Sequence, residues 1–128
     1  MAKASFQEST SLVIVGDDFP EDMLTAKRHR RHPGSFFEEI WLRWRELFEV
    51  LPAAREVGWH EKIDFPDEAL FFRTMRLMVE SDSTPHDLYE EIVANTDGLT
   101  LRWEEFLVLV PSAAKIDWHT IAEKQAGM

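Results

Sequence analysis

The chain has 128 residues, of which 45% are hydrophobic and 30% charged, so its composition is that of an ordinary globular protein and not of a disordered one. It contains no cysteine, which excludes disulfides, cysteine-ligated zinc and a thiol nucleophile. Its net charge of −10 at pH 7 disfavours direct binding to nucleic acid.

At this length we expect a single domain over residues 1–128, with a flexible N-terminus over residues 1–10. The first apolar run, Leu12 to Val15, is too short for a signal-peptide core or a membrane span. We therefore expect a cytoplasmic protein that does not contact a membrane.

The segment from Leu42 to His60 is repeated without a gap from Leu101 to His119. Eight of the nineteen aligned positions are identical, where chance would give roughly one. The match predicts an internally duplicated chain, with one helical repeat over residues 18–63 and a second over 64–126. The identical pairs are Leu42/Leu101, Arg43/Arg102, Trp44/Trp103, Glu46/Glu105, Pro52/Pro111, Ala54/Ala113, Trp59/Trp118 and His60/His119.

Near the N-terminus, the β-branched run from Ser11 to Val15 predicts one short strand. Two similar segments, Asp18 to Glu21 and Asp64 to Asp67, each predict the start of a helix, because proline and acidic residues favour the first helical turn. The helix after the second segment is apolar on nearly all sides as far as Val79. It is expected at the centre of the core or beneath a partner.

A longer helix is predicted to begin at Ser35, which forms a capping-box pattern with Glu38. In the second copy, Thr100 is expected to cap the equivalent helix. The run from Phe106 to Val110 could be a strand by propensity, but its match to the first copy favours a helix. The apolar residues of the first copy recur at helical steps of three and four: Phe37, Ile40, Trp41, Trp44, Leu47, Phe48 and Leu51.

Two further helices are predicted in the second half of the chain. One begins around Thr84 to Asp87 and ends near Ala94, and the other begins after Asp117 and runs to about Ala126. A weaker match of Phe36 to Ile40 with Leu88 to Ile92 requires an insertion near residues 93–99 of the second copy. The fold class we expect is mainly α: two tandem helical repeats packed pseudo-symmetrically, with one short N-terminal β-strand.

No motif in the sequence indicates an enzyme, a cofactor or a metal site. The repeated pairs Trp59-His60 and Trp118-His119 could bind a metal, but no spacing of histidines supplies three or four ligands. We interpret them as core tryptophans beside capped or surface histidines. The adjacent carboxylates Glu38/Glu39, Glu90/Glu91 and Glu104/Glu105 point in different directions on a helix, so they are expected on solvated faces.

Three sets of residues are candidates for contact with a partner protein. The second half is acidic, with eleven Asp and Glu against three Arg between Asp64 and Glu105, which favours a partner with a basic surface. The acidic candidates are Asp82, Asp87, Glu90, Glu91, Asp97, Glu104 and Glu105. A basic patch that could grip anions comprises Lys27, Arg28, Arg30 and Arg31. An aromatic and methionine patch comprises Trp41, Phe71, Phe72, Met75 and Met78.

These observations favour a small acidic, non-enzymatic protein that binds another protein and modulates or inhibits it. Inhibitors, immunity proteins and phage-encoded antagonists of nucleic-acid-binding machines have this character. The alternative is a chaperone-like or assembly subunit that oligomerises, for instance as a homodimer, through the apolar helix after Pro66. A metal-dependent enzyme ranks third.

Overall fold

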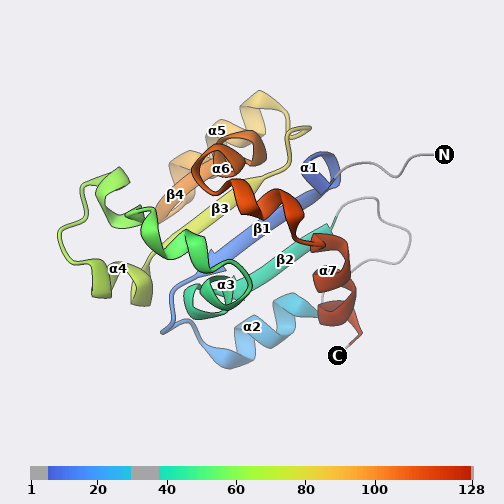
Figure 1. Cartoon of the computed structure of the whole chain (residues 1–128), viewed down its shortest axis with the longest axis horizontal. Coiled ribbons are helices and arrows are strands. Elements are labelled where there is room, and N and C mark those ends of the chain that lie inside the picture. The colour runs from blue at the N-terminus through green and yellow to red at the C-terminus, as the bar shows by residue number, and fades with distance from the viewer. Residues whose placement is uncertain (1–5, 30–37, 128) are drawn as a thin grey trace.

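The computed structural model describes residues 6–29 and 38–127, and these residues form an α/β fold around a four-stranded mixed sheet (Figure 1). The strand order is β2-β1-β3-β4: β1 and β3 are antiparallel at the centre, and each outer strand is parallel to its neighbour. The expected mainly α, all-helical architecture with a single strand is therefore wrong. The strands are β1 (Thr10–Val15), β2 (Glu38–Arg43), β3 (Arg76–Glu80) and β4 (Gly98–Arg102).

The two halves of the chain contain the same elements in the same order, except that the last is a 3-10 helix in the first half and an α-helix in the second. The first half has α1 (Phe6–Ser9), β1, α2 (Glu21–Arg28), β2, α3 (Trp44–Val50) and the 3-10 helices η1 (Pro52–Glu56) and η2 (Trp59–Ile63). The second half has α4 (Glu68–Thr74), β3, α5 (His86–Asn95), β4, α6 (Trp103–Leu109), the 3-10 helix η3 (Pro111–Lys115) and α7 (Trp118–Ala126). The duplicated unit is thus an α/β unit.

Repeated hydrogen bonds identify the equivalent residues. Asp17 donates its backbone N–H to the carbonyl of Phe72 (2.9 Å). Asp82, which is 65 positions after Asp17, donates in the same way to Gln7, which is 65 positions before Phe72 (2.7 Å). Adding 65 therefore takes α1, β1 and α2 onto α4, β3 and α5.

From the second strand onward, equivalent residues are 59 positions apart, as Leu42 and Leu101 are. The second half has the shorter connection, because β2 begins ten positions after α2 ends at Arg28, whereas β4 begins three positions after α5 ends at Asn95. The insertion expected near residues 93–99 is therefore wrong.

The predicted long helix is wrong over its first part, because Glu38–Arg43 is strand β2 and α3 begins only at Trp44. β2 contributes Ile40 to one core and Trp41 to the other, so it is buried on both faces. A strand of this kind is an unbroken apolar run, which periodicity cannot distinguish from a buried helix. Ser35, the expected cap, lies outside the described residues.

The same ambiguity affected two other segments. The apolar helix predicted after Pro66 ends at Thr74, and Arg76–Glu80 is strand β3. Thr100 lies in β4 and does not cap a helix. By contrast, the N-terminal strand, the helical state of residues 106–109, and α5 are confirmed. The final helix is confirmed together with its cap, in which the Asp117 side chain accepts from the Thr120 N–H (3.1 Å).

Helices cover both faces of the sheet (Figure 1). Leu12 and Ile14 of β1 point into the larger core, which also holds the four repeated tryptophans. Val13 and Val15 point to the opposite face, where they pack with Leu24 of α2. None of the helices in the described ranges combines the length and apolarity that a membrane span requires.

The tryptophans that begin α3 and α6 connect the two halves reciprocally. Trp44 donates its indole N–H to the carbonyl of Met75, just before β3 (2.9 Å). Trp103 donates to the carbonyl of Thr10, the first residue of β1 and the equivalent of Met75 (2.6 Å). Both tryptophan side chains are fully buried, and each indole supplies the donor for a backbone carbonyl of the other half.

We expect Trp44→Phe and Trp103→Phe each to destabilise the protein by about 2 kcal/mol, because each leaves a backbone carbonyl of the other half without its donor and opens a small cavity. Urea unfolding followed by circular dichroism measures the loss. Val108→Ala, at a side chain that is 79% exposed, serves as the control and should change stability by less than about 0.5 kcal/mol. A small effect of either tryptophan change would contradict the reciprocal role.

Candidate protein-binding surface

Several residues shared by both halves stabilise helix ends. The backbone N–H of Arg43 is accepted by the Glu46 carboxylate (2.9 Å), and that of Arg102 by the Glu105 carboxylate (3.0 Å). Asp82 accepts from the N–H of Glu104 in the first turn of α6 (3.4 Å). Glu105 and Asp82, two of the acidic candidates, therefore also act as helix caps.

The repeated Trp-His pairs do not form a common site. Trp59 and Trp118 are fully buried, and each donates to a carbonyl five residues earlier in its own half. His60 Nδ1 lies 3.3 Å from the carboxylate of Glu68, whereas His119 Nδ1 lies 2.5 Å from that of Glu38. Within residues 6–29 and 38–127, no group of three or more His, Asp or Glu side chains is placed to hold a metal ion.

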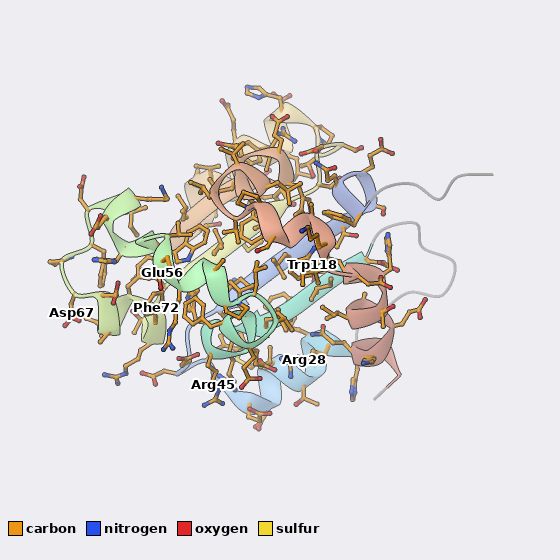
Figure 2. All side chains as sticks on the ribbon, in the orientation of Figure 1. Arg28, Arg45, Glu56, Asp67, Phe72 and Trp118 are labelled. Atoms are coloured by element: carbon orange, nitrogen blue, oxygen red, sulfur yellow. The ribbon has the colours of Figure 1, made fainter. Side chains whose placement is uncertain are left out.

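The two described residues of the basic patch contact their own domain. Arg28 extends from α2 toward α3 and pairs with the Glu46 carboxylate (2.6 Å), while its Nε donates to the Trp41 carbonyl (3.0 Å) (Figure 2). The Lys27 ammonium lies 5.3 Å from the centre of the Trp41 ring. Arg30 and Arg31 lie outside the described residues.

The aromatic and methionine candidates do not lie together on the surface. Phe71 is fully buried, and Phe72 and Met75 pack against the same large core. Trp41 is 6% exposed and packs with Met78 on the opposite face of the sheet.

All seven acidic candidates are exposed, and they lie in the segment from Ser81 to Glu105, which contributes one cationic side chain besides histidine. Arg102 is the single Lys or Arg between Ser81 and Glu105. Its guanidinium donates to the Ser81 carbonyl (3.2 Å) and lies over the Tyr89 ring, 4.4 Å from its centre. The seven carboxylates lie between β3 and α5, on α5, just before β4 and in the first turn of α6, and together we call them the acidic surface.

A groove of about 510 Å³ runs along α5 within the acidic surface. One flank of α5 lines it, through His86, Tyr89, Glu90, Val93 and Ala94, together with Arg102. No residue of α5 is fully buried, and Leu88 and Val93 remain 48% and 47% exposed.

The groove lies beside the outer strand β4, whose edge is less covered than that of β2. At β2, the Gln125 side chain both accepts from the N–H of Trp41 (3.1 Å) and donates to its carbonyl (2.9 Å). At β4, the equivalent residue Thr100 has its carbonyl bonded by the Tyr89 hydroxyl (3.2 Å). The position equivalent to Gln125 is Pro66, which has no side-chain amide.

Two titratable groups near the groove are shifted by burial. Burial raises the pKa of the Tyr89 hydroxyl, with a further contribution from the nearby Glu105 carboxylate, so Tyr89 remains a neutral donor at pH 7. Burial also raises the pKa of Glu80, which is 5% exposed and accepts a hydrogen bond from the Ser11 hydroxyl (3.0 Å).

Comparisons with protein-family models, with curated proteins and with solved structures found no match for this chain. Its function is therefore argued from the geometry described above.

Sequence reasoning identified the acidic residues but not the groove between them. Tyr89, Val93 and Arg102 were not candidates, because charge counting does not locate apolar or stacked side chains. The sequence does indicate that an apolar side chain of α5 is exposed. Leu88 and Val93 lie five positions apart on this ten-residue helix, so they cannot both face the sheet.

We expect Glu80→Gln to stabilise the protein relative to wild type more at pH 7 than at pH 4. Because the folded state raises the pKa of Glu80, it binds the proton more tightly than the unfolded chain does. The free energy of unfolding of the wild type therefore falls as pH rises through the raised pKa of Glu80. The variant has no carboxyl group at this position and does not show this loss.

Urea unfolding of both proteins at pH 4 and pH 7 measures this difference. Glu91→Gln removes an exposed carboxylate and controls for the change in net charge. The same stability difference at both pH values for Glu80→Gln would contradict the assignment.

Proposed function

We propose that this chain is a small acidic, non-enzymatic protein that binds another protein through the acidic surface. The observation that carries the proposal is the packing of α5. Leu88 and Val93 are each about half exposed on this helix, among the carboxylates of Asp87, Glu90 and Glu91. Exposed apolar side chains among charged ones supply what the apolar centre and the polar rim of a protein interface require.

The equivalent helix of the first half supports this interpretation by contrast. α2 buries Leu24, which is 1% exposed, whereas the equivalent residue of α5, Tyr89, is only half-buried. At the position equivalent to Val93, α2 has Arg28, whose side chain is held by Glu46 and Trp41. Two helices with the same place in the duplicated fold therefore differ in how much of their surface is free.

The partner expected for this surface has a basic face. Seven carboxylates in a segment whose one Lys or Arg is the bonded Arg102 attract such a face at long range, and a few apolar contacts then hold it. If the basic face normally binds nucleic acid, occupation by these carboxylates modulates or blocks that binding.

The alternative role is an assembly subunit that oligomerises through an apolar helix. The part of the chain that the structure describes does not contain the exposed apolar helix that this role requires. Phe71 is in the core, and the segment from Arg76 to Glu80 is a central strand. We therefore do not favour it.

We expect Glu90→Lys/Glu91→Lys to weaken partner binding about tenfold or more, because it replaces two attractive charges of the acidic surface by repulsive ones. The partner is obtained by affinity capture from extracts of the native host and identified by mass spectrometry, and its affinity is measured at low and high salt. Wild-type binding should also weaken steeply as salt rises.

The matched control is Glu56→Lys/Glu123→Lys, which changes net charge equally at exposed positions outside α5. It should change affinity less than about twofold. Equal losses for the two double variants would mean that net charge alone governs binding, and the acidic surface would be rejected.

A photoreactive benzophenone amino acid in place of Leu88 should crosslink the same partner, because that side chain lies on the exposed part of α5. The duplication supplies the control position, since Met23 of α2 is equivalent to Leu88 and is exposed to a similar extent, 50% against 48%. Crosslinking is measured by gel shift after irradiation of the complex. Equal yields at both positions, or a higher yield at Met23, would place the interface elsewhere.

A further inference from the structure

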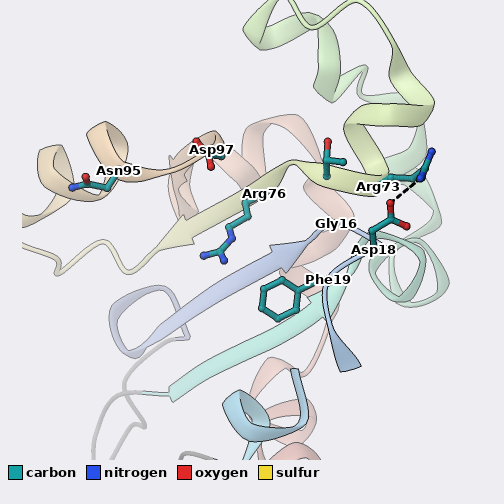
Figure 3. Close-up of a pocket in the computed structure, with 8 residues that line it drawn as sticks. Gly16, Asp18, Phe19, Arg73, Arg76, Asn95 and Asp97 are labelled. Atoms are coloured by element: carbon teal, nitrogen blue, oxygen red, sulfur yellow. Dashed lines mark hydrogen bonds and ion pairs between the residues drawn. The ribbon is translucent and has the colours of Figure 1, made fainter. Parts of the chain in front are cut away.

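A second pocket, of about 410 Å³, opens between the end of β1, the beginning of β3 and the end of α5 (Figure 3). Its volume lies in the range of sites that bind small molecules, roughly 300 to 1,000 Å³. The charged and aromatic side chains that line it are Asp18, Phe19, Arg73, Arg76 and Asp97.

Two of the four charges neutralise each other at the rim. Arg73 and Asp18 form an ion pair, with 2.9 Å between Nη2 and Oδ2, and it is marked by the dashed line in Figure 3. Both side chains are more than half exposed, at 60% and 54%. The pair therefore leaves no net charge on its side of the pocket.

The other two charges are not paired. Arg76 is half-buried, and its guanidinium lies against the ring of Phe19, 5.6 Å from the ring centre. Among the described residues, neither this guanidinium nor the Asp97 carboxylate has a hydrogen bond or an ion pair. Yet the two residues are neighbours, because the backbone N–H of Arg76 donates to the Asp97 carbonyl (3.0 Å). The pocket thus presents one half-buried cation and one exposed anion that have no ion-pair partner among the described residues.

The duplication indicates that the charge of Arg76 is not required by the fold. The residue equivalent to Arg76 is Ser11, and its hydroxyl is satisfied by the buried carboxylate of Glu80 (3.0 Å). In the first half, the residue equivalent to Glu80 is Val15, whose side chain has no hydrogen-bond acceptor to offer Arg76. Within the described part of the chain, Arg76 therefore lacks a carboxylate partner such as the one that Glu80 provides for Ser11.

We infer that this pocket binds a free amino acid as its zwitterion, with the α-carboxylate on Arg76 and the α-ammonium on Asp97. The planar guanidinium held against Phe19 presents parallel N–H donors that match a carboxylate. A simple anion would be repelled by Asp97 and a simple cation by Arg76, whereas a zwitterion satisfies both groups. This inference does not rest on the proposed function, because neither Arg76 nor Asp97 lines the groove along α5, although Asp97 is also one of the seven carboxylates of the acidic surface.

The test begins with titration of each of the twenty common amino acids into the isotopically labelled full chain, followed by NMR. At least one should shift the resonances of Arg76 and Asp97 selectively and saturably. The best ligand is then compared with two analogues, one lacking the amino group and one lacking the carboxylate. Each analogue should bind about tenfold more weakly or worse, because each leaves one pocket charge unsatisfied.

Two variants test the residues, Arg76→Gln and Asp97→Asn, and each should lower affinity about tenfold while the circular dichroism spectrum is retained. The matched control is Arg55→Gln, because Arg55 also lies over an aromatic ring, that of Phe48, but outside the pocket. It should leave affinity unchanged. The inference is overturned if no amino acid binds, if an analogue binds as tightly as the zwitterion, or if the control loses as much affinity as the pocket variants.

Discussion

The antiparallel pairing of β1 with β3 is the contact on which the rest of this structure depends. Among the described residues it is the one strand pairing that joins the two halves, and it places Val13 opposite Met78. These two residues are themselves equivalent, being 65 positions apart, so the pairing marks a pseudo-twofold axis through the sheet. Around that axis the indoles of Trp44 and Trp103 can each reach the carbonyl at the start of the other half's first strand.

Neither half could form this structure alone. Each contributes only two strands, and a two-stranded unit exposes an unpaired edge and is marginally stable in water. Joining β1 to β3 buries both inner edges at once and aligns the apolar residues of the two halves into one large core. The need to join the two halves explains why the tryptophans are repeated in both. Residues that the two halves share are those that fix the fold.

The sequence predicted the duplication, strand β1 and the last helix, because each rests on a local signal: a repeat, a β-branched run or an aspartate cap. It did not predict β2, β3 or β4. These strands are buried on both faces or lead directly into a helix, so their apolar residues follow no alternating pattern. β2 is followed directly by α3 at Trp44, so the sequence offers no turn that would mark where the strand ends and the helix begins. Only the pairing with β1, a contact between distant residues, decides its state.

The candidate site was predictable to the same limited extent. Counting charges located the carboxylates of the second half, since exposure of acidic residues follows from their chemistry. It did not locate the groove, because the positions of Tyr89 and Arg102 depend on how α5 lies against β4. The same holds for Arg76, which the sequence placed on a helix and the structure places in a central strand beside Phe19.

The comparison of α2 with α5 explains why the groove lies along α5 and not along α2. α2 is held by a buried leucine, Leu24, and by Arg28, whose side chain bonds to Glu46 and to the backbone of β2. α5 is held chiefly by Tyr89, through one hydrogen bond and the stacked Arg102, and it buries none of its residues fully. Its other side chains are consequently free of packing requirements. In a duplicated fold, the copy of an element that is needed least for stability is the one whose surface can change, and here that copy is α5.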